Sequence, residues 1–206
     1  CLYASVGVHP HDAGKATGET FERLRTLLSH PKVPAVGEIG LDYHYDHSPR
    51  DVQKRVFLRQ MEIAAAARKP ILIHTRKAWD DTIALLDAHW KPGGLGGVLH
   101  CFSGDETQVR QALDLGFHIS YAGIVTFKRA EDVRRAAATV PLDRLLVETD
   151  APYLTPHPHR KVRRNEPRFV VETARCLAEL RGLSAGELDR ATTRNFRSLF
   201  RIPEPG

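Results

Sequence analysis

The stretch Pro70-Ile71-Leu72-Ile73-His74 joins an unbroken apolar run to a histidine. An apolar run that does not alternate with polar residues is typical of a parallel strand buried on both faces. Similar runs recur along the chain at Tyr3–Val8, Val33–Ile39, Gly97–Leu99, Phe117–Tyr121 and Leu145–Val147. The sequence therefore predicts a fold built on parallel strands.

The segments between these runs carry the start and stop signals of helices. Ser48-Pro49 can supply an N-cap and a proline at the first helical position. Asp105 can cap a helix that ends at Gly116, and Ser184 with Glu187 forms a capping-box pattern. Because strands and helices alternate in this way, we expect a parallel α/β fold.

Metal-binding or acid–base residues follow directly after five of the predicted strands. The residues are His9, Glu38, His74, His100 and the group Glu148-Thr149-Asp150. The carboxyl ends of parallel strands converge on one active-site face, so we expect these side chains to be neighbours in space.

Imidazole and carboxylate groups together suit Zn, Mn, Fe or, with enough oxygen and water ligands, Mg, and this ligand set does not distinguish among them. Any one of these histidines alone is more often structural than a ligand, but jointly the residues favour a metal site. Glu38 is the natural bridge between two cations and Asp150 the natural general base. Glu148 fits either a supporting position behind a metal ligand or a second acid–base group.

A basic, proline-rich loop, residues 156–167, follows the strand that leads to Asp150. Its four basic side chains and two histidines could grip phosphates beside the metals. The alternative is an ordinary solvated loop, and the sequence leaves both open.

The chain has 206 residues, of which 42% are hydrophobic and 27% charged, and its net charge is +5. This size allows one substantial core, so we expect a single domain spanning residues 1–206. No apolar run reaches the about 18 residues that a membrane span needs, which argues against a membrane protein. The widely spaced Cys1, Cys101 and Cys176 form no disulfide framework and favour the cytoplasm.

The sequence resembles the TatD-related metal-dependent deoxyribonucleases, which belong to the amidohydrolase-like barrels. The resemblance runs from Tyr3 to Phe200 and implies a (β/α)8 TIM-barrel type of fold. Six motifs carry it in order: Val6-Gly7-Val8-His9-Pro10-His11, Gly37-Glu38-Ile39-Gly40-Leu41-Asp42-Tyr43, Pro70-Ile71-Leu72-Ile73-His74-Thr75-Arg76, His100-Cys101-Phe102-Ser103-Gly104, Glu148-Thr149-Asp150-Ala151-Pro152-Tyr153-Leu154 and Arg164-Asn165-Glu166-Pro167.

The resemblance also implies an activity, namely hydrolysis of DNA phosphodiester bonds by a metal-activated water. It implies that Glu38 bridges two divalent metal ions and that His74 and His100 bind one of them. It further implies that Asp150 binds the other ion and serves the attacking water. By the same resemblance, His11, Arg76 and Arg164 are candidates for phosphate contacts.

Two features depart from the family pattern. The family opens with a strand that ends in His-x-His, whereas here Tyr3–Val8 matches the third strand. We therefore expect a barrel that lacks its N-terminal segment, with about six βα units, and at most one tightly bound metal ion. The basic loop is one residue longer than the family pattern and lacks its glycine, which weakens the case for phosphate contacts there.

Two other functions compete with the nuclease. The first is a small-molecule amidohydrolase or esterase on the same barrel, which a closed apolar pocket would favour. The second is an inactive truncated remnant, which the absent His-x-His would favour. The basic loop next to the predicted metal ligands favours the nuclease.

Overall fold

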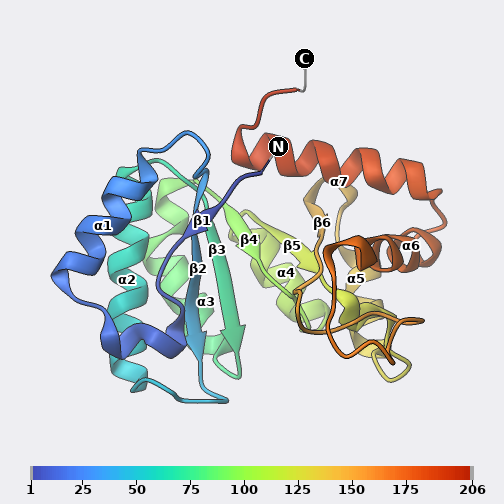
Figure 1. Cartoon of the computed structure of the whole chain (residues 1–206), viewed down its shortest axis with the longest axis horizontal. Helices are drawn as coiled ribbons and strands as arrows, with labels where there is room; N and C mark the ends of the chain where they lie inside the picture. Colours follow the sequence, from blue (N-terminus) through green and yellow to red (C-terminus); the bar gives the residue numbers. More distant parts are fainter. Residues whose placement is uncertain (1, 205–206) are drawn as a thin grey trace. The chain divides into compact units, whose positions relative to one another are not determined.

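The computed structural model describes residues 2–204, which fold into two compact units (Figure 1). Unit 1 comprises the chain up to Leu99 with Leu115–Phe117 and Leu199–Arg201, and unit 2 comprises most of the remainder. The sequence predicts a single domain over residues 1–206. The division into two compact units does not test that prediction, which stays a prediction. Within the described residues, no helix is long and apolar enough to cross a membrane.

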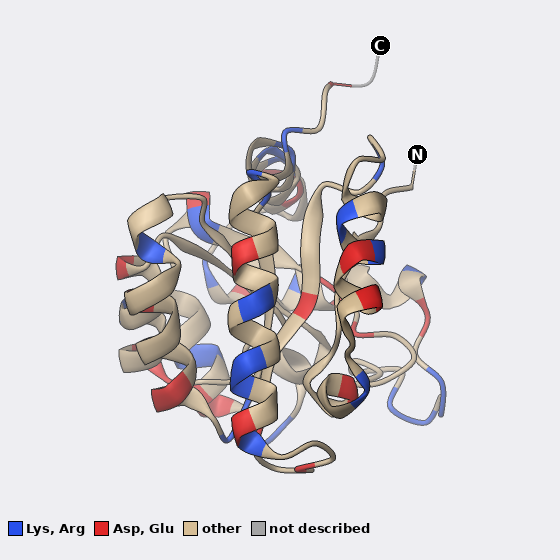
Figure 2. Cartoon of the chain, turned by 90° about the vertical axis from the view of Figure 1, so that its left-hand side faces the viewer, with Lys and Arg blue, Asp and Glu red and all other residues tan. Residues whose placement is uncertain are grey.

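Unit 1 is built on parallel strands that pair in chain order, with helices alongside them (Figure 1). Its surface helices carry residues of both charge signs (Figure 2). Its strands are β1 (Ser5–Val6), β2 (Ala35–Asp42), β3 (Ile71–Arg76) and β4 (Gly97–Leu99). Its α-helices are α1 (Gly18–Leu28), α2 (Arg50–Ala66) and α3 (Trp79–His89), with the 3-10 helices η1 (Pro10–Lys15) and η2 (Lys91–Gly93).

Unit 2 repeats the alternation of parallel strands and helices. Strands β5 (Phe117–Tyr121) and β6 (Leu145–Val147) pair in parallel through Ile119 and Leu145. The α-helices are α4 (Glu106–Asp114), α5 (Glu131–Thr139), α6 (Val170–Leu180) and α7 (Ala185–Phe200). The 3-10 helices are η3 (Gly123–Thr126), η4 (Leu142–Arg144) and η5 (Pro167–Phe169).

Several strands are buried on both faces, as predicted from their apolar composition. In β2, every residue except Glu38 is buried, and all residues of β5 are buried. Because successive side chains of a strand point to opposite faces, both faces of these two strands contribute to the core, which is the arrangement expected of parallel sheets. In β3, by contrast, only Ile71 and Ile73 are buried.

Strands β4, β5 and β6 have the predicted bounds, whereas β1, β2 and β3 differ from them. Strands β2 and β3 continue beyond the predicted ends, because backbone pairing persists from Gly40 opposite His74 to Asp42 opposite Arg76. The prediction that His74 stands just after its strand is therefore wrong, because His74 lies within β3. Glu38 lies in the middle of β2, inside the predicted run Val33–Ile39 but not at the end of the strand.

Gly40 allows β2 and β3 to approach each other closely at this point. Its φ of +139° favours glycine, and a Cβ atom there would lie 2.0 Å from the carbonyl oxygen of His74. A larger residue at position 40 would push apart the two strands that carry Glu38 and His74.

Two of the three predicted helix caps are confirmed. The backbone N–H of Gln108 donates to Asp105 Oδ1 over 2.9 Å, although α4 ends at Asp114 rather than Gly116. Ser184 and Glu187 form the predicted capping box.

The prediction that Ser48 is the N-cap of α2 is wrong. Pro49 occupies that position, because the buried Ser48 hydroxyl instead donates to the His11 carbonyl and accepts the Gly14 N–H.

Candidate metal centre

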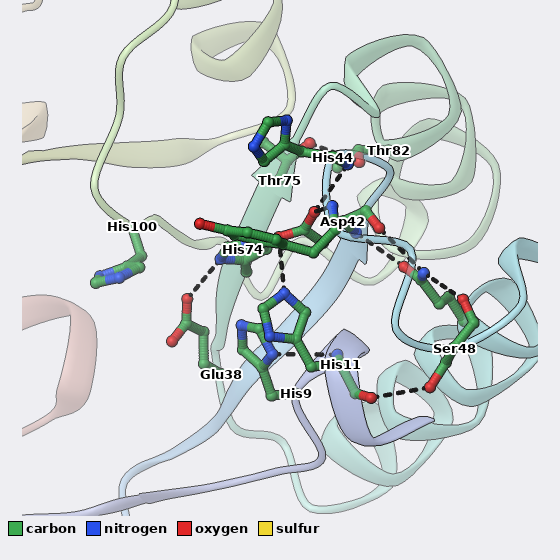
Figure 3. Close-up of polar contacts among 12 residues, drawn as sticks. His9, His11, Glu38, Asp42, His44, Ser48, His74, Thr75, Thr82 and His100 are labelled. Atoms are coloured by element: carbon green, nitrogen blue, oxygen red, sulfur yellow. Dashed lines mark hydrogen bonds and ion pairs between the residues drawn. The ribbon is translucent and has the colours of Figure 1, made fainter. Parts of the chain in front are cut away.

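Three side chains of unit 1 form a group that could hold a metal ion (Figure 3). His9 lies just before η1, Glu38 in β2 and His74 in β3, and one ligand atom from each lies within 4.8 Å of the others. Glu38 Oε1 and His74 Nδ1 are 3.0 Å apart. Because adjacent strands carry Glu38 and His74, the strand pairing itself sets this spacing.

A buried carboxylate, Asp42, lies on the other side of the His74 ring from Glu38 (Figure 3). Its Oδ2 atom is 3.0 Å from His74 Nε2 and 2.9 Å from His11 Nε2. Its Oδ1 atom accepts the backbone N–H groups of His44 and Tyr45, each over 2.9 Å.

The pKa of Asp42 is well below its usual range. Burial alone would raise this pKa, but hydrogen bonds from Tyr45, His11, His74 and His44 outweigh burial and lower it. Asp42 is thus a fixed negative charge at neutral pH, and it can only accept hydrogen bonds.

His9 is the weakest of the three potential ligands. Burial, the largest effect, lowers the pKa of His9 to about 4, so its ring is neutral at pH 7. Its Nδ1 accepts the backbone N–H of His11 over 3.2 Å. As long as that bond is kept, the neutral ring carries its proton on Nε2 and offers a donor there rather than a lone pair. Glu38 and His74 are therefore the principal ligand candidates in unit 1.

In unit 2, His100 is held between two carboxylates. Its Nδ1 is 2.6 Å from Glu148 Oε2, and its Nε2 is 3.3 Å from Asp150 Oδ1. Glu148 also accepts the backbone N–H of Cys101, which immediately follows His100. Glu148 thus fixes the orientation of the imidazole, and Asp150 faces its other nitrogen.

The backbone is strained at two residues of this second group. Cys101 and Asp150 have φ values of 47° and 55°, in the left-handed region that non-glycine residues avoid. At Cys101 such a conformation costs about 1–3 kcal/mol. At Asp150 the cost is smaller, because aspartate and asparagine adopt this region more readily than other non-glycine residues.

The structure brings together Glu38 with His74, and His100 with Asp150. The assignment of all four to the same metal centre stays a prediction. The sequence did not single out Asp42 or propose His9 as a ligand. The signal for His9 was its place after an apolar run, and Asp42 lies within the quoted motif of residues 37–43.

The three predicted phosphate contacts have different surroundings. His11 faces Asp42, and the Arg76 guanidinium lies over the Tyr45 ring, 4.7 Å from its centroid. Arg164 is exposed. Their phosphate contacts stay predictions.

One histidine and one arginine of the loop 156–167 contact aromatic rings. His159 stacks on Phe169 with ring centroids 4.3 Å apart, and the Arg160 guanidinium lies 3.9 Å from the Phe127 ring centroid. All four basic side chains of the loop are exposed, and they are Arg160, Lys161, Arg163 and Arg164.

The end of this basic loop is fastened to the turn that carries Asp150. The buried Asn165 side chain donates to the carbonyls of Thr149 and Tyr153, over 2.8 and 2.6 Å. Its backbone N–H donates to the Pro152 carbonyl over 3.0 Å. These bonds hold the backbone at Asn165 against the turn that carries Asp150. They therefore also keep the adjoining residues Arg163 and Arg164 near that turn.

Comparison with known proteins identifies the family. Residues 1–201 match the model of the TatD related DNase family. The chain belongs to this family. It is 43% identical to the uncharacterized metal-dependent hydrolase YabD of Bacillus subtilis, over 98% of this chain and 78% of YabD. It is 38% identical to a TatD protein of Erwinia billingiae named as a 3'-5' ssDNA/RNA exonuclease, with the same two coverages.

A solved structure of a TatD-family protein supports the same conclusion for the fold. The crystal structure of the TatD homologue YJJV of Escherichia coli matches with a TM-score of 0.90 and 33% identity. The match covers 98% of this chain and 78% of YJJV. The predicted TIM-barrel type of α/β fold is confirmed, and this TatD-family chain is a metal-dependent hydrolase.

Proposed function

We propose that this TatD-family protein is a deoxyribonuclease that hydrolyses DNA phosphodiester bonds with the help of divalent metal ions. The observation that carries the proposal is the pairing of Glu38 with His74, 3.0 Å apart on adjacent strands within a group that could hold a metal. Exposed basic residues fastened to the Asp150 turn favour a polyanionic substrate. The exonuclease name of the Erwinia relative also supports a nucleic acid substrate.

The residues present fit a divalent cation. Imidazole nitrogen with carboxylate oxygen is a donor set that suits Mg²⁺, Mn²⁺ and Zn²⁺. In the proposal, Glu38, His74, His100 and Asp150 would be the ligands of such ions, with Glu38 as the carboxylate that two ions would share and at most one ion bound tightly. When bound, the ions would polarise the scissile phosphate and make the attacking water more acidic.

The side chains then have distinct tasks. Asp150 takes a proton from the water whose oxygen attacks phosphorus, while the bond from phosphorus to the leaving oxygen breaks and that oxygen takes a proton from a second water molecule. Glu148 keeps the His100 ring in place through its 2.6 Å contact with Nδ1. Arg163 and Arg164 offset the charge of neighbouring phosphates. His11 and Arg76 are proposed as further phosphate contacts.

Metal removal tests this function directly. The purified protein should cleave single-stranded or duplex DNA with Mg²⁺ or Mn²⁺, and EDTA should abolish cleavage until metal is restored. Release of nucleotides from a labelled oligonucleotide measures the rate. Cleavage that is indifferent to EDTA, or no cleavage of either DNA with any of the metals, would contradict the proposal.

The double substitution Arg163→Gln and Arg164→Gln should weaken binding of single-stranded DNA. Each phosphate contact contributes about 0.7 to the slope of log affinity against log salt, so two lost contacts should reduce the slope by about 1.4. Fluorescence anisotropy with a labelled oligonucleotide, in EDTA to prevent cleavage, measures the slope.

The matched control for this test replaces Arg190 and Arg194, two exposed arginines on α7, by glutamine. It removes the same net charge from the protein. Equal salt slopes for the two double variants would show that charge alone, and not the basic loop, attracts DNA.

We also propose a cytoplasmic location, from the wide spacing of the cysteines. Among the described residues, Cys176 is a free thiol, and Cys1 lies outside the described residues.

A further inference from the structure

We propose that Asp42 is a positioning residue that selects which ring nitrogen of His74 is available to a metal ion. The inference rests on the metal centre of the proposed function, and it names a residue outside the predicted ligand set. Asp42 touches His74 on the side opposite Glu38, so its direct contact with these two ligand candidates is through the imidazole.

The Asp42 carboxylate is immobilised from all sides. No part of the residue is exposed, and both of its oxygens are engaged, Oδ1 by two backbone N–H groups and Oδ2 by two imidazoles. The buried Gln53 side chain also grips the backbone of Asp42. Gln53 Oε1 accepts the Asp42 N–H over 2.8 Å, and Gln53 Nε2 donates to the Asp42 carbonyl over 3.1 Å. A carboxylate held in this way cannot reorient, so the His11 and His74 rings must match its hydrogen-bonding needs.

The Asp42 carboxylate requires hydrogen-bond donors from these two imidazoles. An ionised carboxylate accepts only, so His11 and His74 must each present an N–H at Nε2. When His74 is neutral, its lone pair then lies on Nδ1, the atom 3.0 Å from Glu38 Oε1. The ligand nitrogen of His74 and the carboxylate of Glu38 therefore face each other because Asp42 holds the opposite nitrogen. Carboxylates that orient metal-binding imidazoles in this manner typically change metal affinity about 10–100-fold.

The Asp42→Asn substitution reverses this requirement without changing the size of the side chain. The amide oxygen can still accept the N–H groups of His44 and Tyr45, which directs the NH2 group toward the two imidazoles. Because NH2 only donates, Nε2 of His74 must accept, and a neutral His74 then carries its proton on Nδ1, toward Glu38. The dissociation constant for Mn²⁺, measured by titration calorimetry, should increase about 10–100-fold.

The matched control is Asp46→Asn. Asp46 is four residues further along, its carboxylate is partly exposed, and it pairs with Arg50 at the surface. Its φ of 50° is one that asparagine tolerates well. The Mn²⁺ dissociation constant of this variant should equal that of the unmodified protein.

A second measurement needs no Asp42 variant and so stands even if Asp42→Asn fails to fold. Nitrogen-15 NMR of the unmodified protein, with the His74 signals assigned from a His74→Gln variant, reports which ring nitrogen carries a proton. Nε2 should be protonated both before and after Zn²⁺ is added.

The proposal is overturned if folded Asp42→Asn binds Mn²⁺ as tightly as Asp46→Asn does. It is equally overturned if His74 in the unmodified protein carries its proton on Nδ1 alone. Neither measurement uses DNA. A protein that fails to cleave DNA would therefore refute the proposed nuclease and leave the outcome for Asp42 unaffected.

Discussion

The Glu38→Gln variant is expected to cleave DNA at least about 10³-fold more slowly than the unmodified protein. Glutamine keeps the length of the side chain and one oxygen, but it removes the negative charge proposed to bridge two cations. Metal ions supply several kcal/mol of transition-state stabilisation in such reactions, and about 1.4 kcal/mol corresponds to a factor of ten in rate. Loss of the bridge should therefore remove most of the activity.

Two measurements check this expectation together. The first is the rate of nucleotide release at saturating DNA, and the second is the number of Mn²⁺ ions bound per chain. The control is Glu62→Gln, which changes an exposed carboxylate on α2 that pairs with Arg59. If Glu38→Gln kept both its rate and its metal content, Glu38 would not be a ligand.

The bounds of the strands show which part of the fold local sequence predicts well. Strands β5 and β6 were predicted at their observed ends, because each is a short apolar run flanked by clear interruptions. Strand β2 runs on to Asp42, although its last residues include charged and small ones. Backbone pairing between Gly40 and His74, and beyond, sustains the strand there regardless of side-chain polarity. Such pairing depends on a neighbour far along the chain, which a local apolar pattern does not report.

The residues of the candidate site, like the bounds of the strands, were predicted only in part from the sequence. The principle that strand ends converge predicted all of these side chains as neighbours. The structure shows contacts of Glu38 with His74 and of His100 with Asp150, and a metal centre shared by all four stays a prediction. Asp42 was not singled out, since an acidic residue after an apolar run commonly caps a helix or faces solvent.

Its role depends on burial and on imidazoles that are 31 and 32 residues away in the sequence. One of these imidazoles is His11, whose Nε2 contacts Asp42, and its predicted phosphate contact stays a prediction. The sequence thus shows which residues are candidate ligands, whereas the side chains that contact them emerge only in the folded chain.

The Asp150→Asn variant is expected to lower kcat for DNA cleavage about 10³-fold. A positioned general base typically contributes about 10²–10⁴-fold, and the amide cannot take the proton of the attacking water. The control is Asp143→Asn, an exposed aspartate in η4 of the same unit, which should keep full activity.

The dependence on metal concentration separates two roles for Asp150. If Asp150 acted only as a ligand, raising Mn²⁺ to saturation should restore the rate of the variant. If it acts as the base, the rate should stay low at saturation. An Asp150→Asn rate equal to that of the control at every Mn²⁺ concentration would remove Asp150 from the mechanism altogether.

The backbone conformation at position 150 makes asparagine a suitable substitution for this test. Asp150 has a φ of 55°, and asparagine is among the few residues other than glycine that adopt this left-handed conformation readily. Alanine would remove the side chain and add strain to the turn that Asn165 fastens through Thr149 and Tyr153. Asparagine retains the turn, the side-chain volume and an oxygen near His100, so a loss of rate reports the missing negative charge and proton acceptor rather than a rearranged loop.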